Sequence, residues 1–114
     1  MTEREKFRIE EARKAIFIRD GYRCQNCGKS IFTYGTPQVA HCIAQTKPNI
    51  RRYGKDVIHH PLNTKAACSL GCNSAFNIGN NPEATRLLVQ EIRTAIDAEK
   101  ATSGKISALV RFQH

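Results

Sequence analysis

Four cysteines stand in two close pairs, a spacing that suits a tetrahedral metal ion. Cys24 and Cys27 form the first pair, Cys68 and Cys72 form the second, and 40 residues lie between the two pairs. Gly28 follows the first pair and permits a tight turn whose backbone amides face the sulfurs. Two thiolates from each pair complete a four-sulfur site of the kind that zinc favours, and four unrelated buried cysteines are the alternative. Because four thiolates leave no open position for water, we expect this zinc to be structural.

A histidine, an asparagine and a fifth cysteine lie between the two cysteine pairs. Near physiological pH a neutral imidazole can take a proton from water, so His41 is a candidate for acid–base chemistry. A lone histidine is more often structural, and a lone asparagine such as Asn63 more often caps a helix or forms a turn. Cys42 lies outside both pairs, and we expect it to be a small buried apolar residue.

These residues follow one another in the order seen in a known family. The segment RDGYRCQNCGK at residues 19–29 resembles the opening of zinc-bearing HNH endonucleases. His41, then Asn63, then the dipeptide Cys72-Asn73 continue in the order of that family. The resemblance covers residues 19–79, just over half of the chain. It is fairly specific because two cysteine pairs enclose the histidine and the asparagine, and a second asparagine directly follows the last cysteine.

The resemblance implies a metal-dependent hydrolysis of DNA phosphodiester bonds, by nicking or by double-strand cleavage. In the family a ββα unit holds the site, and a Mg²⁺ or Mn²⁺ ion polarises the phosphate and stabilises the departing 3′ oxygen. Carried over, His41 is the general base on the first strand, and Asn63 braces the loop that orients it. Asn73 takes the first metal-ligand position on the helix, and Asn77 lies one turn later on the same face.

One position departs from the family pattern. The residue before the base is usually Asp or His, whereas this chain has Ala40, whose side chain cannot bind metal. The site therefore binds its metal weakly, or it takes a replacement ligand from among His59, His60 and Asp56. We prefer His60, because the Pro61 that follows makes this segment rigid and Asn63 is close in sequence. A packed or loop-bracing histidine is the alternative for His60.

The net charge of +8 is concentrated in the centre of the chain. Between residues 21 and 82 there are seven basic residues and one acidic residue, Asp56. This balance suggests a polyanionic partner, with DNA as the first candidate, and a solvated basic face is the alternative. The segment 45–56 reads as a polar loop that binds the phosphates flanking the cut, and the ring of Tyr53 stacks on the DNA or hydrogen-bonds to it. Its candidate DNA-binding residues are Lys47, Arg51, Arg52, Tyr53 and Lys55.

The surrounding pattern predicts a single α+β domain over residues 1–114, with a small zinc-stapled ββα-metal core at about 19–79. A capping box at Thr2 and Glu5 begins a helix over 2–20, and Asn81 and Pro82 begin a second helix over 82–103. Short strands are expected within 38–44 and 57–67, and a helix is expected to begin within 68–79. The tail 106–112 reads as a short strand after a stop at Gly104.

The rest of the composition bears on location and partners. No apolar run approaches the roughly 20 residues of a membrane span, and the charged N-terminus lacks the apolar core of a secretory signal. We therefore expect a cytoplasmic protein without a membrane partner. The terminal helices are candidates for supporting a homodimer, in which two subunits cut both strands of a site. The alternative function is a non-catalytic zinc module that binds nucleic acid, and Ala40 is the residue that favours it.

Overall fold

Two short antiparallel strands lie at the centre of the molecule, which is a computed structural model that describes residues 2–112 and the side chains of residues 2–102. Strand β1 (Gln38–His41) pairs with β2 (Thr64–Ala67). The register sets Ala40 opposite Lys65 and His41 opposite Thr64. His41 is thus the last residue of β1 and lies where the chain leaves the sheet.

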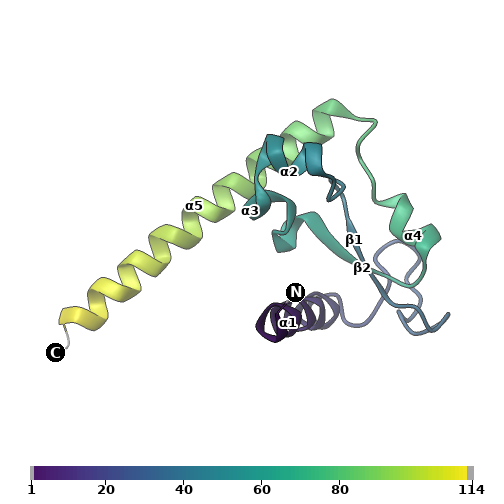
Figure 1. The fold of residues 1–114 in the computed structure, drawn as a ribbon, viewed down its shortest axis with the longest axis horizontal. Coiled ribbons are helices and arrows are strands. Elements are labelled where there is room, and N and C mark those ends of the chain that lie inside the picture. The colour runs from purple at the N-terminus through teal and green to yellow at the C-terminus, as the bar shows by residue number, and fades with distance from the viewer. Residues whose placement is uncertain (1, 113–114) are drawn as a thin grey trace.

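Helices surround this sheet, and the described chain is a small α+β domain, as predicted (Figure 1). Before β1 comes α1 (Glu3–Arg19), and between the strands come α2 (Lys47–Tyr53), α3 (Lys55–Ile58) and the 3₁₀ helix η1 (Pro61–Asn63). After β2 come α4 (Leu70–Ala75) and α5 (Pro82–Phe112). Within residues 2–112 no helix is both long enough and apolar enough to cross a membrane.

The first helix begins and ends where the sequence predicts. The Thr2 hydroxyl accepts a hydrogen bond from the Glu5 amide at 3.2 Å, and Asp20 caps the other end of α1. Gly21 and Tyr22 then adopt left-handed φ values of 65° and 58°, which turn the chain out of the helix. Ile16 is the buried residue of α1, so most of this helix faces solvent.

The segment 45–56 is helical, so its prediction as a loop is wrong. The Thr46 hydroxyl accepts a hydrogen bond from the Asn49 amide at 3.3 Å, and Pro48 stands in the first turn of α2, where its missing amide costs nothing. Gly54, with φ of 93°, separates α2 from α3. The second predicted strand is accordingly short, because residues 55–63 are mostly helical and only Thr64–Ala67 pair with β1.

The last helix begins at the predicted cap. The Asn81 side-chain oxygen accepts a hydrogen bond from the Ala84 amide at 3.0 Å, and Pro82 is the first helical residue. The helix continues through Gly104 to Phe112, so the predicted stop and the predicted strand at 106–112 are wrong. A glycine inside a helix costs only about 1 kcal/mol, which neighbouring helix formers offset.

Two separate clusters of buried side chains hold these elements together. The larger cluster joins the segment after β1 to α3 and α5, and its buried members are Ile43, Val57, Ile58, Val89 and Ile92. The smaller one lies between the sheet, α4 and the first cysteine pair, and its buried members are Cys24, Ala40, Ala67 and Cys68. Cysteine and alanine bury little apolar area, so the second cluster gains little from the hydrophobic effect alone.

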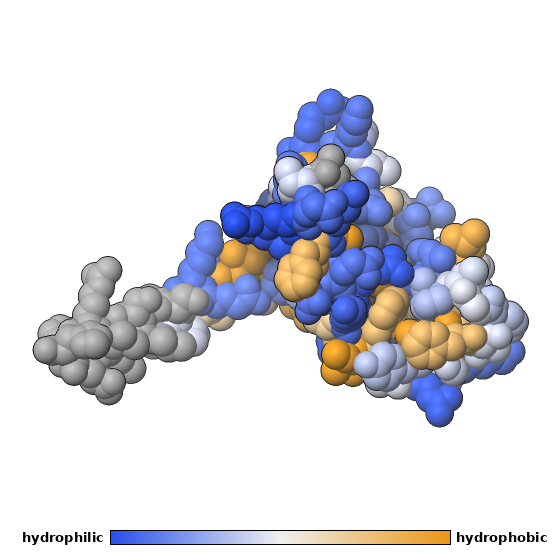
Figure 2. Space-filling view, turned by 60° about the horizontal axis from the view of Figure 1, so that its bottom comes forward, coloured by the Kyte–Doolittle hydropathy of each residue, from blue (hydrophilic) through white to orange (hydrophobic). Residues whose placement is uncertain are grey.

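The outer surface mixes hydrophilic and hydrophobic side chains. Figure 2 shows orange hydrophobic residues interspersed with blue hydrophilic ones on one face of the molecule. The most exposed of the large hydrophobic side chains are Phe7, Ile18, Phe32 and Leu70. Single exposed apolar residues of this kind are normal on folded proteins.

Candidate functional site

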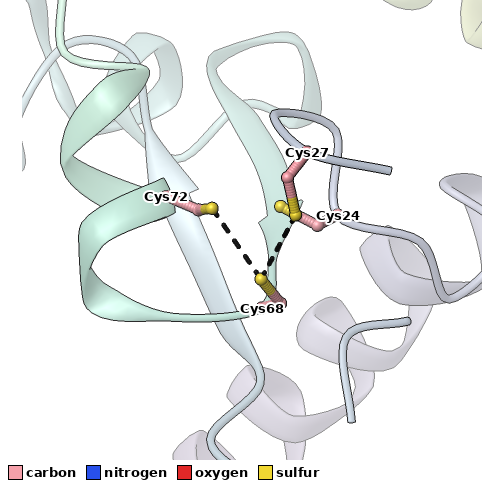
Figure 3. Close-up of side chains that lie close together, drawn as sticks. All are labelled: Cys24, Cys27, Cys68 and Cys72. Atoms are coloured by element: carbon pink, nitrogen blue, oxygen red, sulfur yellow. Dashed lines mark hydrogen bonds between the residues drawn. The ribbon is translucent and has the colours of Figure 1, made fainter. Parts of the chain in front are cut away.

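The sulfurs of the two cysteine pairs meet in one cluster, with Cys68 between its neighbours (Figure 3). All four lie within 4.8 Å of one another, and the Cys68 sulfur is 3.6 Å from that of Cys27 and 3.8 Å from that of Cys72. A tetrahedral zinc ion with Zn–S bonds of about 2.3 Å sets its sulfurs about 3.8 Å apart. The spacing therefore fits the group, and the four cysteines can hold a metal ion such as zinc.

Backbone hydrogen bonds shape the first cysteine turn as Gly28 predicts. Gly28 has a φ of 80°, its amide donates to the Cys24 carbonyl at 2.9 Å, and the Cys24 amide donates to the Lys29 carbonyl at 2.7 Å. In the second turn the Ser69 hydroxyl caps α4 by accepting a hydrogen bond from the Cys72 amide at 3.2 Å. The second cysteine pair has three residues between its members and the first has two. The wider separation follows from this geometry, because Cys72 lies in the first turn of a helix.

The acidities of these thiols diverge. Burial raises the pKa of Cys24, but backbone amides that include those of Cys27 and Asn26 outweigh it and bring the pKa down to about 6. Burial and hydrogen bonds to the neighbouring sulfurs raise the pKa of Cys68 to about 12. The Asn26 amide donates to the Cys72 sulfur at 3.4 Å and lowers the pKa of Cys72. Four adjacent sulfurs cannot all carry charge alone, and a divalent cation supplies the missing compensation.

His41 lies at the end of β1, half-buried, with a second imidazole beside it. The His41 and His59 ring centroids are 5.9 Å apart and the ring planes meet at 85°. Burial lowers the pKa of His41, and the like charge of His59 lowers it further. Both effects favour the neutral imidazole at neutral pH, which is the form that accepts a proton.

Asn63 is fully buried and braces the chain just after His41. Its side-chain oxygen accepts a hydrogen bond from the Ile43 amide at 2.8 Å. Its side-chain amide donates to the carbonyls of Ile43 at 3.0 Å and Ile58 at 2.8 Å, and its backbone carbonyl accepts from the Cys42 amide at 2.9 Å. The asparagine thereby ties together the segments that follow β1 and α3.

Asn73 faces β1 from α4, where it meets a residue that sequence reasoning missed. Its side-chain amide donates to the Gln38 side-chain oxygen at 3.4 Å. Gln38 lies two residues before Ala40, so both point to the same face of the strand. Ala40 itself is fully buried against the cysteine cluster. The alternation of side chains along a strand was the signal that could have identified Gln38.

The side chains of His60 and Asn77 are both held by hydrogen bonds to other residues of the chain. The His60 Nδ1 accepts a hydrogen bond from the Leu62 amide, and its Nε2 is 3.1 Å from a Glu99 carboxylate oxygen, so both ring nitrogens are engaged in bracing contacts. The prediction that Asn77 shares a helix face with Asn73 is wrong, because α4 ends at Ala75. The Asn77 side-chain oxygen instead accepts a hydrogen bond from the Gly79 amide at 2.7 Å.

The described side chains do not form the oxygen-rich site that Mg²⁺ or Mn²⁺ ordinarily uses. Among residues 2–102, the four cysteines are the only group of three or more His, Cys, Asp or Glu side chains close enough to share an ion. The His41 side chain points to the opposite face of β1 from Gln38 and its partner Asn73, so the structure does not bring the imidazole together with these carboxamides, and no carboxylate joins them in a group of that kind. A hard divalent ion prefers carboxylate oxygens, so these residues do not fit it well.

The basic residues of the predicted DNA-binding segment lie on α2 and α3. Lys47, Arg51, Arg52 and Lys55 are exposed, and the Arg52 guanidinium lies 5.5 Å from the ring centroid of Tyr53. The tyrosine ring is half-buried and packs against the larger core cluster. The cations are therefore accessible to a polyanion, whereas much of the Tyr53 ring is buried against the core.

Arg19 and Asp20 anchor α1 next to the braced segment. The Arg19 guanidinium donates to the carbonyls of Pro61 at 2.8 Å and Thr64 at 2.7 Å. The Asp20 carboxylate pairs with Arg19 and accepts a hydrogen bond from the Ala66 amide at 2.8 Å. Burial opposes the ionised carboxylate, but these contacts keep the pKa of Asp20 below its ordinary value. The Arg19–Asp20 pair thus links the end of α1 to the residues on both sides of Asn63.

Comparisons of this chain with protein-family models, with curated proteins and with solved structures find no match. The resemblance to HNH endonucleases rests on the residues of this chain.

Proposed function

We propose that this protein is an endonuclease of the HNH type that hydrolyses phosphodiester bonds in DNA. One observation carries the proposal: His41, half-buried and with a lowered pKa, ends a strand whose following segment is held by the buried Asn63. The two strands and α4 around it correspond in order to the ββα unit that the resemblance implies. Burial favours the neutral form of the histidine, and the braced segment limits its movement, and both properties support a role as general base.

The chemistry follows from that placement. Neutral His41 accepts a proton from a water molecule, and the resulting hydroxide attacks the phosphorus atom. The bond from phosphorus to the 3′ oxygen then breaks, and the departing oxygen takes a proton from solvent water, which leaves 5′-phosphate and 3′-hydroxyl ends. Exposed cations of α2, Arg51 and Arg52 among them, neutralise phosphates flanking the cut. In this proposal the cysteine cluster holds a structural zinc ion, because four sulfurs leave no position for substrate.

Incubation of the purified protein with supercoiled plasmid tests this proposal. Wild type should convert the plasmid to nicked or linear DNA, and His41→Ala should lose roughly 10²- to 10⁴-fold of the rate. His60→Gln provides the comparison: it should keep the activity if this buried histidine only braces the chain, and lose it if His60 is the replacement metal ligand. Reactions with Mg²⁺, with Mn²⁺ and with neither measure the metal dependence that the resemblance implies. Equal rates for His41→Ala and wild type, with zinc content unchanged, would remove His41 from the mechanism.

A second candidate function is a zinc-bearing module that binds nucleic acid without cutting it. The observation that favours it is Ala40, which is fully buried and offers no ligand at the position where the family has one. This protein would bind DNA through its basic helices and leave plasmid intact under every metal condition. DNA binding without any cleavage by wild type would decide for this candidate.

A further inference from the structure

A groove of about 820 Å³ runs between α2 and the N-terminal half of α5, outside the site around His41. Its wall near the sheet includes Ile43 and Ala44, which come two and three residues after His41. The side chain of Asn49 extends from α2 and donates to the Ala44 carbonyl at 2.9 Å. The groove therefore opens directly beside the segment that follows the proposed general base.

Three arginines line this groove from its two walls. Arg52 lies on α2, and Arg86 and Arg93 lie on α5, all three exposed. Two acidic residues reduce this positive charge: Glu83 pairs with Arg86 at 3.2 Å, and Asp97 lines the groove further along α5. The groove keeps an excess of positive charge, and Arg93 has no hydrogen-bond or ion-pair partner among the described side chains.

The spacing of the two arginines on α5 allows both to contact one nucleic-acid strand. Arg86 and Arg93 are seven residues apart, which places them on one face about 10 Å apart along the helix. Successive phosphates along one strand are closer together than about 10 Å, so two cations at this separation can contact separate phosphates of the same strand. Arg52 reaches the same groove from the facing helix. A path for the sugar–phosphate backbone thus lies between two helices that each contribute cations.

We infer that this groove binds the phosphate backbone of one strand of duplex DNA and so extends the contact of the protein beyond α2 onto α5. The inference deepens the proposed function, on which it rests for the identity of the polymer. Phosphate contacts of this kind position the duplex and carry no direct sequence information. The α5 residues Arg86 and Arg93 are therefore positioning residues that present a strand to the segment next to His41.

Fluorescence anisotropy with a labelled 30-base-pair duplex, without added divalent ion, measures this contact separately from cleavage. The full chain with Arg86→Gln and Arg93→Gln should bind roughly tenfold or more weakly than wild type near 0.1 M salt. The slope of log K against log salt should fall by about 1.8, since each lost phosphate contact accounts for about 0.9. Zinc content and the melting temperature should remain those of wild type, because both side chains are exposed.

The matched control is the chain with Arg4→Gln and Arg8→Gln, which removes the same charge from α1. In Figure 1 this helix lies on the other side of the strands from α2 and the start of α5. The control should keep nearly the wild-type slope. An unchanged slope in the Arg86 and Arg93 variant, an equal loss in the control, or no binding by wild type would overturn the inference. If wild type binds as described but never cuts plasmid, the nuclease proposal fails and the groove assignment stands.

Discussion

The side chain of Asn63 is hydrogen-bonded to both backbone polar groups of Ile43, at 2.8 Å from the amide and 3.0 Å to the carbonyl. A carboxamide can pair in this way because it offers one acceptor and one donor side by side. The paired backbone lies two residues beyond His41, where the chain has left β1. The asparagine side chain therefore satisfies the backbone polar groups that a neighbouring strand would otherwise pair with, and it fixes the segment that follows β1.

Removal of this brace should destabilise the protein strongly. Asn63→Ala leaves three buried hydrogen-bonding groups without their partner, and each costs about 1–3 kcal/mol. We expect a loss of at least about 3 kcal/mol in the free energy of unfolding, measured by urea denaturation. Asn80→Ala, an exposed asparagine, should change it by no more than about 0.5 kcal/mol. A loss below about 1 kcal/mol for Asn63→Ala would contradict the bracing role.

Zinc content and folding should be coupled through the cysteine cluster. Cys68→Ser should lose the metal and much of the folded structure around it, because the buried members of the neighbouring cluster are small side chains that bury little area. Cys42→Ser should retain the metal, since this buried cysteine lies outside the cluster. Elemental analysis and circular dichroism measure both variants. A full complement of zinc in Cys68→Ser, or none in wild type, would rule out the four-sulfur site.

The His41 pKa should respond to its neighbour. His59→Ala removes a like charge and part of the covering surface, so the pKa of His41 should rise toward its ordinary value near 6.5. The acid limb of any cleavage rate profile should then shift to higher pH, because less of the base is neutral at a given pH. Titration of the His41 ring by NMR gives the pKa directly. An unchanged pKa in His59→Ala would show that the second imidazole exerts no influence.

The same lowered pKa predicts a stability change with pH. Since the folded pKa of His41 lies below the unfolded value, the unfolded chain binds more protons at pH values below about 6.5. Stability should therefore fall as the pH drops from about 7 through the folded pKa. His41→Gln should lessen this dependence, and thermal unfolding of the two proteins between pH 5 and 7.5 measures the difference. Parallel curves of stability against pH for the two proteins would show that His41 does not have a lowered pKa in the folded state.

The cations of α2 should contribute uniform affinity. Arg51→Ala with Arg52→Ala should weaken binding to duplexes of unrelated sequence alike and lower the log–log salt slope by about 1.8. Tyr53→Ala should instead lower stability, because part of that ring packs against the larger core cluster. Anisotropy titrations on two unrelated duplexes and a thermal melt separate these effects. If the double variant binds with the wild-type salt slope, these arginines do not contact phosphates.

Local signals in the sequence were sufficient for several elements. The caps at Thr2 and Asn81 begin α1 and α5 as predicted, because each acts on amides within one turn. The cysteine spacing likewise predicted one cluster, since each pair can bend around a shared ion only in a short turn. The segment 45–56 was misread because its charges and its Pro48 suggested a loop, whereas the Thr46 cap makes it helical.

The candidate site, in contrast, depends on contacts that no local pattern predicts. Gln38 meets Asn73 across 35 residues only because α4 lies over β1, and the ring of His59 reaches His41 because α3 ends beside the sheet. Sequence order predicted His60 as the replacement ligand, yet its ring is turned toward Glu99 on α5. Residue types and spacing are set by the chain itself, but the direction of each side chain is set by the packing of distant elements, and that packing exists only in the folded protein.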